Sequence, residues 1–275
     1  RSRPWTIDPN LSRLLINELL AWPSGDARDQ VELFNDSATA ADLGGMSLTD
    51  NPTKPRKFVF PAGSRLEAGA YHVLGDELGF KLDADGEGVW LFDGGGELLD
   101  SVEFGSQLQG RSIGRVGRTG DWSLTRPTLG APNTADALGQ ADAVRLVKWM
   151  ANPLDGERDS VELFNQGALP VALEGMRLSS QPIGAPTMFV FPPLSFIGVT
   201  TGLTLDSRAL GFKLPAAQGE IGLANADGRW LEHIVYGPQS TGGGLAEHPS
   251  VIISEVMSDN RTTLADEDGD FPDWI

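Results

Sequence analysis

One five-residue phrase occurs twice in this chain of 275 residues, and it constrains the fold more than any other feature. Val31-Glu32-Leu33-Phe34-Asn35 recurs as residues 161–165, at an offset of 130. Four further matches follow in the same order while the offset drifts only to 132: LGGM/LEGM (43–46, 173–176), FVFP (58–61, 189–192), LGFKL (78–82, 210–214) and LDSVEFG/LEHIVYG (99–105, 231–237). Solenoid repeats are about 20–45 residues long. The much longer period predicts a tandem of whole domains.

The repeats also set the expected domain boundaries. A third copy is predicted to begin at VIISEVMSDN (251–260), which resembles LLINELLAWP (14–23). Asp273 stands at the position where Asp29 and Asp159 precede the repeated phrase. We predict five segments: an N-terminal extension (1–13), a first domain (14–133), a linker (134–141), a second domain (142–250) and the start of an incomplete third copy (251–275).

The local patterns are those of β-strands. Short stretches rich in β-branched and aromatic residues are bounded by Gly, Pro, Asn or Asp, and no segment sustains a helical period. We therefore predict an all-β chain of tandem immunoglobulin-like β-sandwiches. In the repeated strand, Val, Leu and Asn share one face while Glu and Phe share the other. We interpret Glu32 and Glu162 as charges on edge strands. Charged side chains at a sheet edge discourage pairing with another chain.

Charge and composition exclude several classes of function. The net charge is −17, so the surface repels phosphate backbones and nucleic acid is not an expected partner. The local basic cluster of Arg111, Arg115 and Arg118 is sparse. No run of apolar residues is long enough to span a membrane. The absence of cysteine excludes disulfides, thiolate metal sites and cysteine nucleophiles.

The strongest chemical signal is an acidic stretch, ADEDGDFPDW, near the end of the chain. Asp266, Asp268, Asp270 and Asp273 surround Gly269 and offer oxygen ligands for calcium. The order of residues departs from an EF-hand loop, and a solvated acidic loop is the alternative. DADGEG (83–88) looks similar, but its counterpart PAAQGE lacks Asp, so we interpret it as a hairpin turn.

No catalytic set can be assembled from the sequence, and the chain is expected not to be an enzyme. The three histidines, His72, His233 and His248, belong to no recognised catalytic motif. STGGG (240–244) could cradle an anion but reads as a flexible loop. Trp22 and Trp149 differ between the copies, so at least one is a candidate for exposure, where it would stack on a sugar ring or anchor a partner.

The first copy resembles the bacterial lamin-tail-like domain. The resemblance runs from INELLA (16–21) through the repeated phrase and LGFKL to a closing signature of SIGR (112–115), GDW (120–122) and PTLGAPN (127–133). The second copy lacks that closing signature and has Lys148 in place of Glu18. The resemblance implies an immunoglobulin-like sandwich and a non-catalytic module of large secreted or surface proteins, often beside nucleases, phosphatases or spore-coat-kinase-like domains.

These observations predict a structural or interaction module of an extracellular or cell-surface protein. Its expected partners are other protein domains or subunits, including a second copy of itself. The strand VIISEVM (251–257) is predicted either to complete the second domain or to add to the edge of a neighbouring chain. The alternative is a targeting or regulatory module of a larger extracellular hydrolase, a nuclease or phosphatase, whose catalytic domain lies outside this chain.

Overall fold

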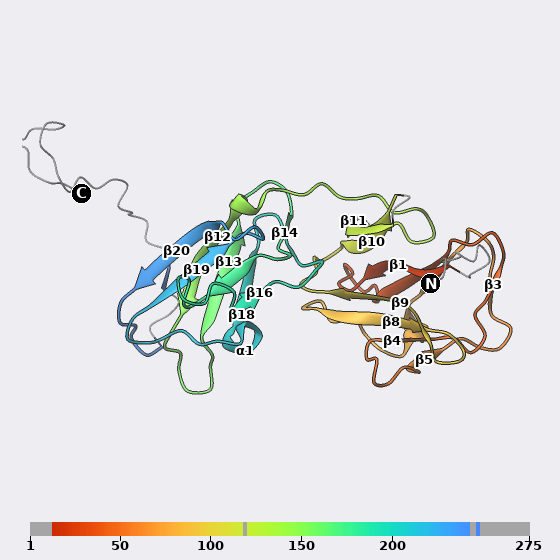
Figure 1. Ribbon diagram of the computed structural model, residues 1–275, viewed down its shortest axis with the longest axis horizontal. Helices are drawn as coiled ribbons and strands as arrows, with labels where there is room; N and C mark the ends of the chain where they lie inside the picture. Colours follow the sequence, from red (N-terminus) through yellow and green to blue (C-terminus); the bar gives the residue numbers. More distant parts are fainter. Residues whose placement is uncertain (1–12, 118–119, 243–245, 248–275) are drawn as a thin grey trace, which may run out of the picture.

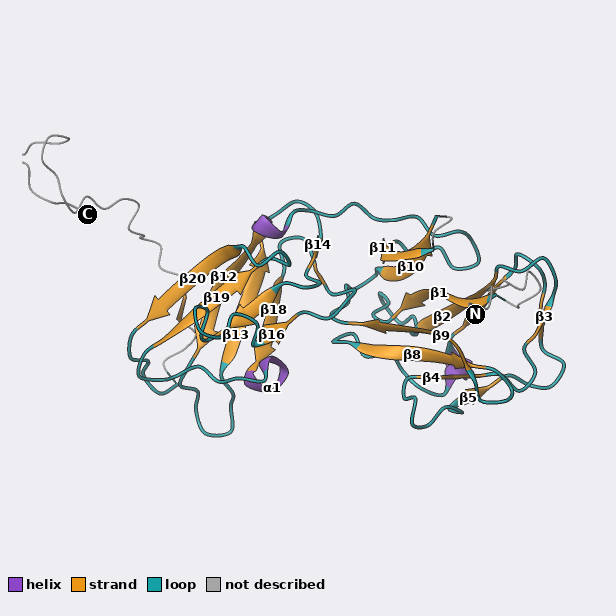
Figure 2. Ribbon diagram, viewed as in Figure 1, coloured by secondary structure: helices purple, strands orange, loops and turns teal. Residues whose placement is uncertain are grey.

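The computed structural model describes residues 13–117, 120–242 and 246–247. In this part of the chain nearly all regular structure is β, in two sandwiches that lie side by side along the long axis (Figures 1 and 2). The all-β, immunoglobulin-like fold class is therefore confirmed. No helix in the described ranges has the length and apolar character needed to cross a membrane.

The first sandwich packs a five-stranded sheet of order β11-β10-β1-β2-β7 against a four-stranded sheet of order β5-β4-β8-β9. A small third sheet pairs β3 with β6, and a 3-10 helix, η1 (Asp76–Leu78), follows β7. Its strands are β1 (Leu14–Leu20), β2 (Gln30–Asn35), β3 (Ala41–Asp42), β4 (Ser47–Thr49), β5 (Phe58–Val59), β6 (Arg65–Leu66), β7 (Tyr71–Leu74), β8 (Glu87–Phe92), β9 (Leu98–Phe104), β10 (Ser112–Val116) and β11 (Asp121–Thr125).

The second sandwich has the same plan with fewer described strands in one sheet. Its two main sheets have the orders β18-β13-β12-β21 and β16-β15-β19-β20, and β14 pairs with β17. Its elements are η2 (Ala141–Ala143), β12 (Val144–Met150), β13 (Ser160–Asn165), β14 (Val171–Ala172), β15 (Arg177–Ser179), β16 (Phe189–Val190), β17 (Phe196–Ile197), β18 (Gly202–Asp206), α1 (Ser207–Leu210), β19 (Gly219–Ala224), β20 (Trp230–Tyr236) and β21 (Ala246–Glu247).

The repeated phrase forms β2 and β13, and it plays the same part in both sandwiches. Val31, Leu33 and Asn35 are fully buried, as are Val161, Leu163 and Asn165. The Asn35 amide donates to the backbone oxygens of Thr39 and Leu66, and the Asn165 amide donates to those of Leu169 and Gly198. The Asn at the end of the strand thus fixes the following turn, as its position in the sequence indicates.

A register shift in the first strand creates a staple between the two sheets of each sandwich. The pairing of β1 with β2 shifts between Ile16 and Glu18, and the Ile16 N–H donates to the Asp100 carboxylate of β9 at 2.9 Å. Arg115 of β10 also binds Asp100, at 3.0 Å. In the second sandwich the Leu146 N–H donates to Glu232 of β20 at 2.6 Å. Each carboxylate therefore accepts from a backbone donor beside the register shift.

Candidate functional site

The two sandwiches are joined by a short strand-like pairing of backbone groups. The Gly105 N–H donates to the Pro193 oxygen at 3.0 Å, and the Phe196 N–H donates to the Ser106 oxygen at 2.8 Å. The Gln107 side-chain amide adds a third bond, to the Leu194 oxygen at 2.8 Å. Backbone groups that are paired in this way leave few unsatisfied donors at the contact. We call these two segments, residues 105–107 and 193–196, the junction.

Leu194 is the anchor of the junction. Its backbone has φ +52°, in the left-handed region that non-glycine residues rarely adopt. Its side chain is only 8% exposed and packs, with that of Phe196, among the core residues of the first sandwich. The corresponding residue of the first sandwich is Gly63, with φ +83°. An unfavourable backbone conformation is thus offset by burial across the junction.

Gly105 shows how closely the two segments approach. A Cβ atom at this position would collide with the hydroxyl of Ser195, and it would lie 3.4 Å from the Pro192 Cβ. Gly105 is therefore required by space at the junction rather than by its backbone angles, because its φ is not among the positive values.

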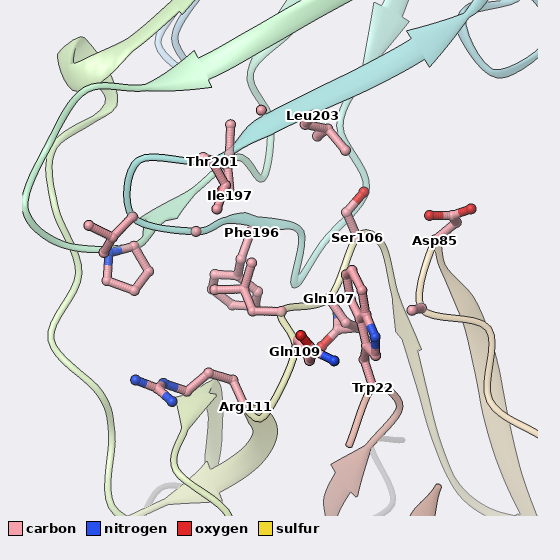
Figure 3. Close-up of a pocket in the computed structure, with 16 residues that line it drawn as sticks. Trp22, Asp85, Ser106, Gln107, Gln109, Arg111, Phe196, Ile197, Thr201 and Leu203 are labelled. Carbon is pink, nitrogen blue, oxygen red and sulfur yellow. The ribbon is translucent and has the colours of Figure 1, made fainter. Parts of the chain in front are cut away.

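A cleft opens beside the junction, with an estimated volume of about 500 Å³ and walls from both sandwiches. Trp22, Gln107, Gln109 and Asp85 come from the first sandwich, and the second contributes Phe196, Ile197, Thr201 and Leu203 (Figure 3). Trp22 is 46% exposed, whereas Trp149 is 4% exposed. The prediction that one of these two tryptophans is exposed is therefore confirmed, and the exposed one lies in the cleft.

The polar groups of the cleft divide into those that hold the structure and those that face solvent. Arg111 is held by the Asp136 carboxylate at 2.7 Å, and the Gln107 amide is used at the junction. Gln109, Asp85 and Thr201 are exposed. The cleft consequently offers an aromatic ring, an amide, a hydroxyl and a carboxylate, while its cation is already neutralised.

A buried pair of carboxyl groups lies on the outer face of the β1–β2 pair. Glu18 and Glu32 are direct cross-strand partners, and both are completely buried. Burial raises the pKa of each above its usual value, and for Glu32 the neighbouring Glu18 raises it further. Donors from Ser112 (2.6 Å) and Thr128 N–H (3.0 Å) bind Glu18, while Asn17 (2.7 Å) and the Gly130 N–H bind Glu32.

The structure corrects the interpretation of Glu32 as an edge-strand charge. β2 lies between β1 and β7, and β13 likewise lies between β12 and β18. Glu32 is covered by the segment at 127–133. Backbone N–H groups of this segment donate hydrogen bonds to the carboxylates of Glu18 and Glu32. The carboxyl pair is inaccessible to a substrate and acts as a clasp that holds this segment on the sheet. Glu162 in the second sandwich is half-buried, with Lys148 Nζ at 4.0 Å.

A smaller hollow also borders the junction and contains Glu87. Its residues include Trp90, Glu103, Pro192 and Pro193. Burial, with the nearby carboxylates of Asp50 and Asp83, raises the pKa of Glu87 to about 7 despite the hydrogen bond that it accepts from the Asp83 N–H. Trp90 is only partly buried, because its ring lies over Gly88 on the outer face of β8.

The other sequence-predicted sites have different outcomes. The proposed calcium ligands Asp266, Asp268, Asp270 and Asp273 lie outside the described residues, as do Arg118, His248 and part of the STGGG loop. Within the described ranges, no cluster of side chains could hold a metal ion. Arg111 and Arg115 are paired with Asp136 and Asp100, so they form no basic patch. His233 contacts Glu220 at 3.0 Å. The DADGEG stretch forms a turn, with the Gly86 N–H bound to the Asp83 oxygen. The predicted hairpin is wrong, because the preceding strand β7 pairs with β2 and the following strand β8 pairs with β4 and β9 of the other sheet.

Residues 8–106 match the family model of the lamin tail domain. Most of the first sandwich is therefore similar to a lamin tail domain. The match covers β1 to β9 and ends before β10, so the covering segment at 127–133 lies outside it. Lamin tail domains are non-catalytic interaction modules. A search of curated proteins finds no match.

Two solved structures show a weak likeness to the chain. One is the crystal structure of the Amycolatopsis orientalis exo-chitosanase CsxA, and the other is from a study of the inhibition of the exo-β-D-glucosaminidase CsxA. Each is 15% identical, with a TM-score of 0.24, and covers 79% of this chain. The chain spans 26% of the length of those chains. A likeness of this size carries no argument about fold or function.

Proposed function

We propose that the chain is a non-catalytic interaction module of an extracellular or cell-surface protein, and that the cleft beside the junction binds its ligand. The observation that carries the proposal is the exposed ring of Trp22 in a cleft of about 500 Å³ built by both sandwiches. Binding sites for small ligands are commonly concave, with apolar walls and a few polar groups that fix orientation.

The chemistry of the cleft favours a neutral saccharide. The flat ring of Trp22 suits the apolar face of a sugar ring, and exposed tryptophan contributes strongly to recognition. The amide of Gln109, the hydroxyl of Thr201 and the carboxylate of Asp85 are suitable partners for sugar hydroxyl groups. An anionic ligand is disfavoured, because Arg111 is occupied by Asp136 and Asp85 carries a negative charge.

The proposal can be tested by titrating the full chain with neutral oligosaccharides, first on a glycan array and then by calorimetry. Trp22→Ala is expected to weaken binding at least about tenfold, the loss of a central aromatic contact. Trp230→Ala is the matched control, because Trp230 is 38% exposed but lies outside the cleft. Equal losses in both variants, or no binding to any neutral glycan, would contradict a saccharide site in the cleft.

Assembly by strand addition is a second part of the proposal. In the first sandwich, β10 and β11 extend the sheet beyond β1, whereas among the described residues of the second sandwich only the two-residue β21 lies beyond β12. This shorter sheet supports a strand supplied by another segment or another chain. The strand nominated from the sequence, residues 251–257, lies outside the described part of the chain.

A targeting module of a larger extracellular hydrolase would use the same cleft. It differs in requiring a nuclease or phosphatase domain in the same polypeptide. Sequencing the gene on both sides of this segment distinguishes the two proposals: a neighbouring catalytic domain would favour targeting, and further sandwiches alone would favour a structural array.

A further inference from the structure

The junction segment 105–107 of the first sandwich has a counterpart in the second sandwich, and within the described residues this counterpart is not covered by another sandwich. The Gln239 N–H donates to the Ala216 oxygen at 2.8 Å, as the Gln107 N–H donates to the Ala84 oxygen at 2.8 Å. The Gln239 amide also donates to the Gly237 oxygen at 2.9 Å, as that of Gln107 does to Gly105. Residues 237–239, here called the free rim, therefore have the local hydrogen bonding of residues 105–107.

The free rim is open where its counterpart is covered. A Cβ atom at Gly237 would meet nothing within 4 Å, whereas one at Gly105 would collide with Ser195. Val235, which precedes the rim on β20, is 72% exposed. No hydrogen bond from Gly237 N–H to another backbone group is seen among the described residues.

The junction segment 193–196 of the second sandwich likewise has an uncovered counterpart in the first sandwich. Residues 61–65, here called the free turn, correspond to 192–196: the Leu43 N–H binds the Ser64 oxygen at 2.8 Å, and the Leu173 N–H binds the Ser195 oxygen at 2.8 Å. Gly63 shares the left-handed backbone of Leu194. Pro61, Ala62, Gly63 and Arg65 are exposed.

The two uncovered halves match in polarity. At the junction, an apolar rim with Trp22 and Leu108 meets an apolar turn with Leu194 and Phe196. On the free rim, polar Asn152 and Ser240 stand at the positions of Trp22 and Leu108. On the free turn, Gly63 and Arg65 stand at the positions of Leu194 and Phe196. The hollow that includes Asn152 has three acidic residues (Asp155, Glu157 and Asp159) and two basic ones (Arg158 and Lys213). Its small excess of negative charge complements the charge of Arg65.

We propose that the free rim of one copy of this chain binds the free turn of a second copy. The contact would use the three hydrogen bonds of the junction: Gly237 N–H to the Ala62 oxygen, Arg65 N–H to the Pro238 oxygen, and the Gln239 amide to the Gly63 oxygen. Because rim and turn are different surfaces at different sandwiches, the contact is heterologous, and it links copies head to tail into a ring or an open chain.

Cysteine trapping tests the proposal cleanly, because the native chain has no cysteine. Purified Ser64→Cys and Gly237→Cys chains are mixed in equal amounts at high concentration under mild oxidation, and the disulfide-linked species are identified by mass. Gly105→Cys combined with Ser195→Cys is the geometric control: the Ser195 Cβ lies 3.1 Å from a Cβ built at Gly105, just below the range of about 3.5–4.5 Å that a disulfide spans. Ser195→Cys also removes the hydroxyl that a Cβ at Gly105 would meet. Ser101→Cys, at an exposed site on β9, replaces Ser64→Cys as the matched negative control.

The expected result is a heterodisulfide between positions 64 and 237 at several times the yield of either homodisulfide and of the 101–237 pair. Equal yields of all species, with the control pair at the junction fully formed, would overturn the proposal. If Ser64→Cys shifts the unfolding midpoint, Pro61→Cys takes its place, since Pro61 is exposed and the Cβ of its counterpart Pro192 lies 3.4 Å from a Cβ built at Gly105. A chain carrying both cysteines should then form a ladder of oligomers, and a product that stops at the dimer would also exclude head-to-tail growth.

Discussion

At Leu194 we expect the glycine variant to be more stable than the alanine variant, which is the reverse of the usual order. Leu194→Ala removes most of a buried side chain and keeps the left-handed backbone with a Cβ, which should cost about 2–3 kcal/mol for a site at a contact between sandwiches. Leu194→Gly loses the same contacts but relieves about 1–2 kcal/mol of backbone strain. Glycine also loses more conformational entropy on folding, which lowers the free energy of unfolding by about 0.5–1 kcal/mol relative to alanine. Glycine should therefore be more stable than alanine here by up to about 1.5 kcal/mol.

Thr200 supplies a matched control for the strain term. It also has a left-handed backbone, with φ +49°, but it is exposed, and its counterpart in the first sandwich is Gly69 at φ +68°. Thr200→Gly should stabilise the chain by about 0.5–1 kcal/mol, because strain is relieved and little contact is lost. At Leu173, which is fully buried with an ordinary φ, alanine should be more stable than glycine.

The assay is equilibrium unfolding in urea, with the free energy of unfolding compared across these variants. The midpoints of Leu194→Ala and Leu194→Gly should both fall below that of the native chain, with glycine the higher of the two. If the alanine variant at position 194 is the more stable one, the left-handed backbone of Leu194 does not impose the strain that the prediction assumes. If neither variant is destabilised, Leu194 does not anchor the junction.

Two further predictions concern carboxyl groups. The raised pKa of Glu87 means that the folded chain binds more protons than the unfolded chain between 4.5 and about 7, so stability from this group is present below that window and is lost as pH rises through it. Glu87→Gln should flatten the dependence of the melting temperature on pH across the window, and an unchanged slope would contradict this assignment. Glu32→Ala leaves the Gly130 N–H and the Asn17 amide without their acceptor and should cost about 2–4 kcal/mol in urea unfolding. Glu162→Ala, at the half-buried counterpart, should cost less than about 1 kcal/mol, and equal losses would refute the clasp.

The sequence predicted the strands well because alternation reports directly on a half-buried sheet. The face assignment of Val31, Leu33 and Asn35 is confirmed by their burial. The edge-strand interpretation of Glu32 is wrong, because alternation shows which residues share a face and not what covers that face. The cover comes from residues about a hundred positions further on, and only the tertiary structure brings them together.

The junction was missed for a different reason, although a signal was present. Leu194 and Thr200 occupy positions where the first copy has Gly63 and Gly69, and a non-glycine residue at a left-handed position indicates a local reason to tolerate strain. The alignment of the two copies could therefore have singled out this turn. The exposure of Trp22 was predicted only as one of two possibilities, because the sequence does not show what covers each tryptophan. Trp149 lies within β12 and packs in the core of the second sandwich, whereas Trp22 follows β1 and lies in the cleft.

The junction has a mechanical consequence. The covalent connection at 134–141 and the three hydrogen bonds of the junction join the same two bodies, so they act as a tether and a latch in parallel. Force applied to the two ends would break the few bonds of the latch before it extracted a strand from either sheet. The sandwiches would then separate without unfolding, and the tether would keep the two halves of the latch close enough to fasten again. A chain of such units would lengthen under load and recover its length when the load is removed.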